Sequence, residues 1–324
     1  MEAPPEKLSQ TGCVKAGDPK QFADIVLPYE VNSPLWSDAS DKSRGLVIPA
    51  GKQIHVVDCS KDTCAQGVYD DGKWQLPVGS VAIKNFGFDG KLVETRLFVR
   101  FDEKNYVGYS YRWDEAQTDA TIVPDERVTV MFNTGKRTVE WNYPNRLDCS
   151  TCHNNQAFGF IGFETQQMNR VVGGTNQIDA LKSKNVFEAP PKSPYAAALV
   201  APYPNQLGSP PATATLDERA RSYLHGNCAY CHRPDGDFQN HDLRFGVPMK
   251  DMGICNSEPV KGDLGVTGAV NLSPGDPKNS IMYLRMQVRR QAKIGMPQLG
   301  TYVVDPDGSE LIGQWITSIK SCPQ

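Results

Sequence analysis

Two pentapeptides of the form Cys-x-x-Cys-His constrain this chain more than any other feature of its sequence. They are Cys149-Ser150-Thr151-Cys152-His153 and Cys228-Ala229-Tyr230-Cys231-His232. On a helical turn the two cysteines of such a run lie on one face, and the adjacent imidazole can ligate a metal. This is the signature of c-type haem attachment, in which the thiols bind the vinyl groups and the histidine is the proximal iron ligand. The sequence therefore predicts two covalently attached haem c groups.

The same Cys-x-x-Cys spacing occurs in zinc sites and in thioredoxin-like redox pairs. A zinc ribbon brings its two cysteine pairs close in sequence, whereas Cys152 and Cys228 are far apart here. Zinc also has no need of a histidine directly after each pair. A redox pair is expected in a βαβ context, which neither run has. Haem attachment is therefore the interpretation that fits both runs.

Charge and hydropathy exclude several classes of partner. The net charge of −3 and the pI of about 6.0 give no electrostatic footprint for nucleic acid. No apolar stretch approaches the length of a transmembrane segment. The start, Met1-Glu2-Ala3-Pro4, has neither a basic nor an apolar signal region. Because c-type haem is matured outside the cytoplasm, we expect a periplasmic or otherwise exported bacterial protein whose precursor carries an export signal.

The first half of the chain predicts an all-β domain. After an N-terminal tail at residues 1–23, residues 24–141 show period-two patterns with turn signals, which predicts a β-sandwich-like domain. Asp89-Gly90 between residues 80–86 and 92–99 predicts a hairpin, and a further strand covers residues 106–113. A second hairpin, from residues 128–132 and 137–141, leads directly into the first Cys-x-x-Cys-His run.

The second half predicts a multidomain arrangement that ends in helices. Residues 142–190 form a first haem-binding segment with a helical patch at 165–172, and residues 191–212 form a Pro-rich linker. Thr215-Leu216-Asp217-Glu218 is a capping box that opens a helix running to Cys228. Residues 307–320 repeat apolar positions at helical spacing. This order of helix, haem motif, loop and closing helix predicts a mainly α class I cytochrome c domain at residues 213–324.

The sixth iron ligands are predicted from local context. Met296 lies in a loop ahead of the closing helix, where class I cytochromes place their axial methionine, and Met286 is its competitor and more typical of a core residue. For the first haem, Met168 has the best local argument. The other candidates are Met131, His55 and His241, or no sixth protein ligand at all. The candidate cationic partners of the haem propionates are Arg146, Arg170, Arg233 and Arg285.

Four segments together resemble a family of exported bacterial dihaem c-type cytochromes. They are Pro34-Leu35-Trp36-Ser37-Asp38, Val93-Glu94-Thr95-Arg96-Leu97-Phe98-Val99-Arg100, the stretch from Tyr143-Pro144 through the first haem motif to Gln167-Met168-Asn169, and Arg221-Ser222-Tyr223-Leu224-His225-Gly226-Asn227-Cys228. The resemblance implies an N-terminal β domain and a C-terminal class I cytochrome c domain. Some members are associated with quinoprotein dehydrogenase-like β-propellers. Members often have Leu where this chain has Met168.

Five of the nine cysteines remain after haem attachment. Cys59 and Cys64 flank a short polar turn and can close a disulfide in an oxidising compartment. A second pair, Cys255 and Cys322, is implied by the family resemblance. Cys13 is then left without a partner, as a free thiol or an intermolecular link.

Two functions follow from these predictions. The first is an electron carrier between a periplasmic dehydrogenase and a downstream acceptor, with redox proteins as partners, a quinoprotein dehydrogenase among those that the resemblance implies. The second is a dihaem enzyme of the peroxidase or oxidase type, with an open coordination site at the first haem. A carbohydrate-binding or adhesive module would depend on the β domain alone. We favour the electron carrier over the catalyst.

Overall fold

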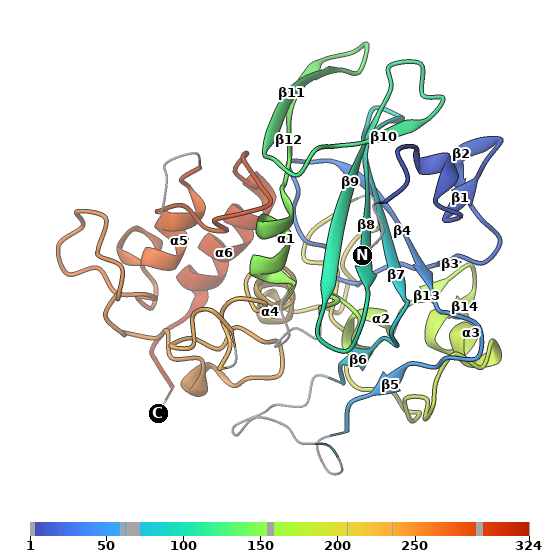
Figure 1. Ribbon diagram of the computed structural model, residues 1–324. Helices are drawn as coiled ribbons and strands as arrows, with labels where there is room; N and C mark the ends of the chain where they lie inside the picture. The colour runs from blue at the N-terminus through green and yellow to red at the C-terminus, as the bar shows by residue number, and fades with distance from the viewer. Residues whose placement is uncertain are drawn as a thin grey trace.

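The computed structural model describes residues 4–58, 62, 72–153, 159–205, 207–234, 236–289 and 294–323. Strands fill most of the first half of the chain, and helices gather in the C-terminal part (Figure 1). Within these residues no helix is both long and apolar enough to cross a membrane. The predicted Cys59–Cys64 disulfide lies outside the described residues.

One antiparallel sheet organises the β part. Its strand order is β10-β9-β8-β7-β4-β3. The strands are β3 (Leu27–Pro28), β4 (Asp41–Val47), β7 (Val81–Phe88), β8 (Lys91–Arg100), β9 (Tyr106–Trp113) and β10 (Ala120–Ile122). The predicted hairpin is present, because Asp89 and Gly90 join β7 to β8 with φ of 54° and 83°. Positive φ at both positions is what a type I′ turn requires.

The remaining strands of the described residues form two-stranded sheets. These are β1 (Val14–Lys15) with β2 (Asp18–Phe22), β5 (His55–Val56) with β6 (Trp74–Gln75), β11 (Val128–Asn133) with β12 (Thr138–Tyr143), and β13 (Val171–Val172) with β14 (Thr175–Asn176). The hairpin β11–β12 is the second one predicted. A sandwich-like pair of sheets was expected, but the described strands make one large sheet, because the other strands pair only two by two and do not join into a second layer.

Residues 4–23 differ from the expected tail, because they pack against the large sheet. Leu8, in the short helix η1 (Leu8–Gln10), is fully buried, and the Ile122 amide donates to the Glu6 carbonyl at 2.9 Å. Cys13 is buried in the same apolar cluster, and burial raises the pKa of its thiol. This layer covers one face of the sheet and leaves the opposite face to the haem-motif segments.

The helices lie mainly beyond residue 145. They are α1 (Arg146–Cys152), α2 (Thr165–Met168), α3 (Gln177–Ser183), α4 (Leu216–Asn227), η2 (Met249–Asp251), η3 (Pro277–Asn279), α5 (Ile281–Met286) and α6 (Pro306–Ser318). The predicted capping box opens α4, since Thr215 and Glu218 bond each other reciprocally. Helices α4 and α6 pack together around Trp315, whose indole donates to Asp217 at 2.8 Å.

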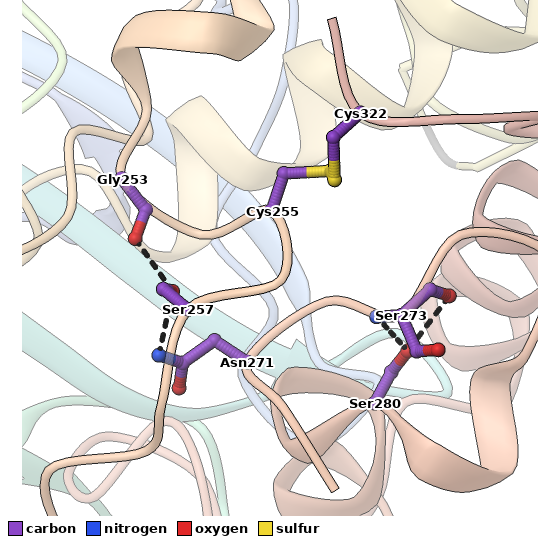
Figure 2. The surroundings of a disulfide bond; sticks show 7 residues. All are labelled: Gly253, Cys255, Ser257, Asn271, Ser273, Ser280 and Cys322. Carbon is purple, nitrogen blue, oxygen red and sulfur yellow. Dashed lines mark hydrogen bonds between the residues drawn. A yellow bond between two sulfur atoms is a disulfide. The ribbon is translucent and has the colours of Figure 1, made fainter.

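A disulfide joins Cys255 to Cys322, the pair that the family resemblance implies (Figure 2). Beside it, the Asn271 amide donates to Ser257, and the Ser257 hydroxyl donates to the Gly253 carbonyl. The bond ties the chain end after α6 to the loop that follows η2.

Residues 191–212 were expected as a linker, yet they dock on both halves of the molecule. The Leu199 amide donates to the Gln166 carbonyl at 3.1 Å, and the Val200 amide donates to the Ser222 hydroxyl at 3.0 Å. The Tyr203 hydroxyl donates to Asp305 at 2.6 Å. The Pro-rich stretch therefore holds the β part and the helical part together rather than separating them.

Candidate cofactor cavity

Both Cys-x-x-Cys-His runs line one cavity of about 300 Å³. The sequence-predicted residues along its wall are Cys149, Cys152, His153, Cys228, Cys231, His232 and Met296. The large sheet contributes part of the wall through Phe98 and Gly108, and the segment after α1 contributes Phe160 and Phe163. Residues far apart in sequence are thus brought to a single cavity.

Helix α1 carries the first motif onto the sheet. Its N-terminus is a capping box, in which Asn145 accepts from the Asp148 amide at 2.8 Å and Asp148 accepts from the Asn145 amide at 3.2 Å. The helix packs on β9, between the sheet and the helices of the C-terminal part (Figure 1). A Cβ atom at Gly108 would lie 2.8 Å from the Cys149 sulfur. Only glycine therefore lets the motif approach the strand this closely.

A backbone hydrogen bond fixes the orientation of the His153 ring. Its Nδ1 donates to the Gly159 carbonyl at 2.6 Å, which leaves Nε2 as the nitrogen with a free lone pair. The ring packs against Phe98 with centroids 4.1 Å apart. Burial, helped by the charges of Lys84 and Arg96, lowers the pKa of His153 to about 4. The imidazole is therefore neutral at neutral pH and able to bind a metal.

The second motif follows α4 directly. The Cys228 amide donates to the Leu224 carbonyl at 2.8 Å and the His232 amide to the Cys228 carbonyl at 3.0 Å, so the helical turn continues into the motif. The His232 ring stacks on Phe238 at 5.4 Å, and burial lowers the pKa of His232 to about 4. Its Nδ1 is buried and has no hydrogen-bond partner in the described part of the chain. A buried imidazole with such an orphaned atom fits a site built for another group.

The two motifs touch through one cysteine from each. The Cys152 thiol bonds to Cys231, and this hydrogen bond together with burial raises the pKa of Cys152. Burial also raises the pKa of Cys149, and it raises the pKa of Cys228 to about 12. The thiols of Cys149, Cys152 and Cys228 are therefore protonated at neutral pH, and the two motifs meet at Cys152 and Cys231.

The β part also contacts the helix that leads into the second motif. The Ser33 hydroxyl donates to the Ser222 carbonyl at 2.7 Å, and the Trp36 amide donates to the Asn227 side chain at 2.7 Å. A Cβ atom at Gly226 would lie 2.6 Å from the Ser33 carbonyl oxygen. The backbone of segment 33–38 therefore packs directly against the end of α4.

Met296 lines the cavity, as its loop context predicts. The Met296 amide donates to the Arg285 carbonyl at 2.9 Å, and the Arg289 guanidinium donates to the Met296 carbonyl at 2.5 Å. Met286 is a core residue beside α4 and α6.

The candidates for the first haem's sixth ligand are not brought to this cavity. Met168 is fully buried in a separate apolar cluster, where Gln177 contacts its sulfur at 3.7 Å. Met131 is 63% exposed on β11. His55 pairs with Asp62 and Glu188. The His241 Nδ1 bonds to the Gly253 carbonyl, and its ring stacks on that of His232.

The cations of the cavity wall are ones that sequence reasoning missed. Arg44, Lys84 and Arg96 line it, and they lie directly opposite one another on β4, β7 and β8. The four arginines proposed from sequence lie elsewhere: Arg146 pairs with Asp125, Arg170 and Arg285 donate to backbone carbonyls, and Arg233 does not line the cavity. Only the strand register, which no local pattern gives, aligns the three cations.

A buried pair formed by a histidine and a glutamate joins the two halves of the molecule. His225 accepts at Nδ1 from the Phe245 amide at 3.0 Å, so its Nε2 donates to Glu164 at 2.5 Å. Both side chains are almost fully buried. His225 thus holds α4 to the segment that carries α2.

No three His, Cys, Asp or Glu side chains gather into a group able to hold a bare metal ion, as far as the described residues extend. The neutral imidazoles, the buried thiols and Met296 instead form a donor set spread along one cavity wall. Comparison of the chain with protein-family models, curated proteins and solved structures finds no match.

Proposed function

We propose that this protein is a dihaem c-type cytochrome that carries electrons between a periplasmic dehydrogenase and a downstream acceptor. One observation supports this above all others. Both Cys-x-x-Cys-His runs open into the same cavity, and Cys152 contacts Cys231. Haems attached there would lie edge to edge, as a carrier that passes electrons between two centres requires.

The residues of the wall fit two haem c groups. The four motif cysteines would form the thioether bonds, and His153, His232 and Met296 would be the axial ligands. Bound haem supplies one-electron redox chemistry. Phe98, Phe160 and Phe163 line the same cavity and would pack against the porphyrin.

In this proposal residues 213–324 form a class I cytochrome c domain. Helix α4 leads into the second motif, Met296 follows in a loop, and α6 closes the chain. In this proposal the protein acts outside the cytoplasm, where c-type haem is matured. Its partners are redox proteins, a quinoprotein dehydrogenase among them.

Intact-mass measurement of protein produced in an exporting host tests the proposal. We expect the chain to be heavier than the polypeptide by two haem groups. Replacing Cys149 and Cys152 by Ser, or Cys228 and Cys231 by Ser, should remove one haem each, whereas Cys13→Ser should retain both. A wild-type mass without haem would refute the function.

A second candidate function is favoured by the ligand count. Among the described residues of the cavity wall, the His and Met side chains are His153, His232 and Met296, which is one fewer than two six-coordinate haems need. A first haem without a sixth protein ligand would suit a dihaem enzyme of the peroxidase or oxidase type. A high-spin signal in the oxidised protein that cyanide or peroxide removes would favour this enzyme, and two low-spin signals would favour the carrier.

A further inference from the structure

Three cationic residues form a row across the face of the large sheet that lines the cavity. Arg44 on β4 is paired in register with Lys84 on β7, which is paired with Arg96 on β8. Side chains directly opposite one another in antiparallel strands have Cβ atoms about 5 Å apart. We call these three residues the cation row. All three line the cofactor cavity.

Like charges directly opposite each other destabilise a sheet, and burial increases the cost. Part of the charge of the row is balanced. Glu94 takes two hydrogen bonds of 2.8 Å from Arg96, so that pair is satisfied. Glu94 also accepts from the Trp141 indole at 2.9 Å, which leaves it little capacity for Lys84.

The rest of the row is poorly balanced. Arg44 is 5% exposed, and its Nη1 lies 3.9 Å from Glu30 Oε2. Neither of these two buried atoms has a hydrogen-bond partner among the described residues. Lys84 lies over the Phe86 ring at 5.0 Å. Burial and the neighbouring cations lower the pKa of Lys84 well below its usual range. Arg44 Nη1 is therefore a buried cationic group without a hydrogen-bond partner in the described part of the chain, and Lys84 is a half-buried amine beside it, so an anion in the cavity would bind between them.

We propose that the cation row is a carboxylate-binding platform for the propionate groups of haem attached in this cavity. This inference rests on the proposed function. The row runs between the motifs, because Arg96 and Lys84 lie near Cys149 and His153, and Arg44 lies near Tyr230 of the second motif. Arginine and lysine side chains form charge-assisted hydrogen bonds with carboxylates, and arginine does so with a two-pronged geometry. A free carboxylate would be recognised by the same chemistry.

The test compares the intact dihaem protein with Arg44→Met and Lys84→Met. Arg112→Met is the matched control, because Arg112 is exposed on β9 of the same sheet and does not line the cavity. Arg44→Lys keeps the charge and separates its loss from a loss of packing. Haem content is measured by mass, propionate hydrogen bonding by the propionate bending bands in resonance Raman spectra, and the reduction potentials by spectroelectrochemistry.

We expect both Met variants to shift the propionate bands and to lower at least one reduction potential. An unbalanced carboxylate near the haem stabilises the ferric iron, which is why the potential falls. Arg112→Met should match the wild type, and Arg44→Lys should remain close to it. Unchanged bands and potentials in variants that carry two haems would overturn the platform while leaving the proposed function intact.

A second arm titrates acetate into each oxidised protein. If the wild type gives a saturable absorbance change that both Met variants lose, and their propionate bands do not move, the row binds a free carboxylate and the propionate assignment is overturned. If the wild-type mass contains no haem, the proposed function fails first and the propionate assignment fails with it.

Discussion

The carboxylate of Asp38 lies 2.7 Å from the hydroxyl of Thr301, which donates to it across the boundary between the β part and the Met296 loop. The same carboxylate oxygen accepts from the amides of Tyr302 and Val303 at 2.7 and 2.8 Å. Asp38 is buried and has φ of 53°. A left-handed aspartate is uncommon and is retained where its surroundings require it. The β part thus fixes the loop that carries the candidate axial methionine.

Asp38→Ala should release this loop. The substitution removes the charged acceptor of the part-buried hydrogen bonds from the Tyr302 and Val303 amides, and a hydrogen bond to a charged group is worth about 1.5–3 kcal/mol. We expect Met296 to leave the iron in part of the molecules. The weak red charge-transfer band of methionine-ligated ferric haem should decrease, and the reduction potential of that haem should fall, because methionine ligation favours the reduced iron.

Asp119→Ala is the matched control for this prediction. Asp119 also accepts three hydrogen bonds, from the amide and hydroxyl of Ser9 and from the Ala120 amide, but it lies away from the cavity. It should lower stability without changing the red band. An Asp38→Ala protein with two haems and an unaltered red band would show that the loop does not need Asp38.

The hairpins were predictable because their signals are local. Asp89-Gly90 and the alternating residues around it specify β7 and β8 without help from the rest of the chain. The helix before Cys228 was predictable for the same reason, since Thr215 and Glu218 are three positions apart and cap it together.

The arrangement of the cavity was not predictable from local patterns. Arg44 and Lys84 are far apart in sequence, and only the register of β4 with β7 brings them together. Met168 has the spacing of a helical patch, but the whole of α2 is buried, so its sulfur packs in the core. Met296 could be predicted because its place ahead of the closing helix is a feature of sequence order.

Gly108→Ala should weaken haem attachment at the first motif. The added methyl group would lie 2.8 Å from the Cys149 sulfur and 3.2 Å from its Cβ, so α1 must move away from β9. Overpacking of this kind costs about 1–3 kcal/mol. We expect a larger fraction of molecules with a single haem, measured by intact mass.

Gly17→Ala is the control for that substitution, because nothing lies within 4 Å of a Cβ placed there. It should leave the haem content at the wild-type value. Full loading of Gly108→Ala with two haems would mean that the close approach of Cys149 to β9 is not needed for attachment.

The Asp148 carboxylate should make the stability of α1 dependent on pH. Its hydrogen bonds from Arg127 and from the Asn145 amide hold the pKa of Asp148 below its usual range. A carboxylate with a lowered folded-state pKa contributes its full stability above the unfolded value of about 4, and loses it as the pH falls through the folded value. Thermal unfolding followed from neutral pH into the acid range should show this loss in the wild type.

Asp148→Asn should remove that part of the acid dependence and lower stability at neutral pH by up to about 1 kcal/mol, the range for an ion pair with an exposed partner such as Arg127. The control is Asp24→Asn, at a side chain that is 95% exposed. It should follow the wild-type curve. If Asp148→Asn also keeps the wild-type acid slope, the carboxylate does not stabilise α1 in the way argued.

Loss of the Cys255–Cys322 disulfide should destabilise the helical part selectively. The bond closes a loop with a sequence separation of 67 that contains α5, α6 and the Met296 loop. Constraining an unfolded loop of this length is worth about 4 kcal/mol in the chain-entropy treatment, which sets the upper limit of the loss. In the double variant Cys255→Ser, Cys322→Ser, hydrogen exchange should therefore speed up across α5 and α6, while the amides of β7 and β8 keep their protection.

Cys13→Ser controls for removal of a thiol from a core. Equal loss of protection in the sheet and in the helices would mean that the two parts unfold as one unit and that the disulfide supports both.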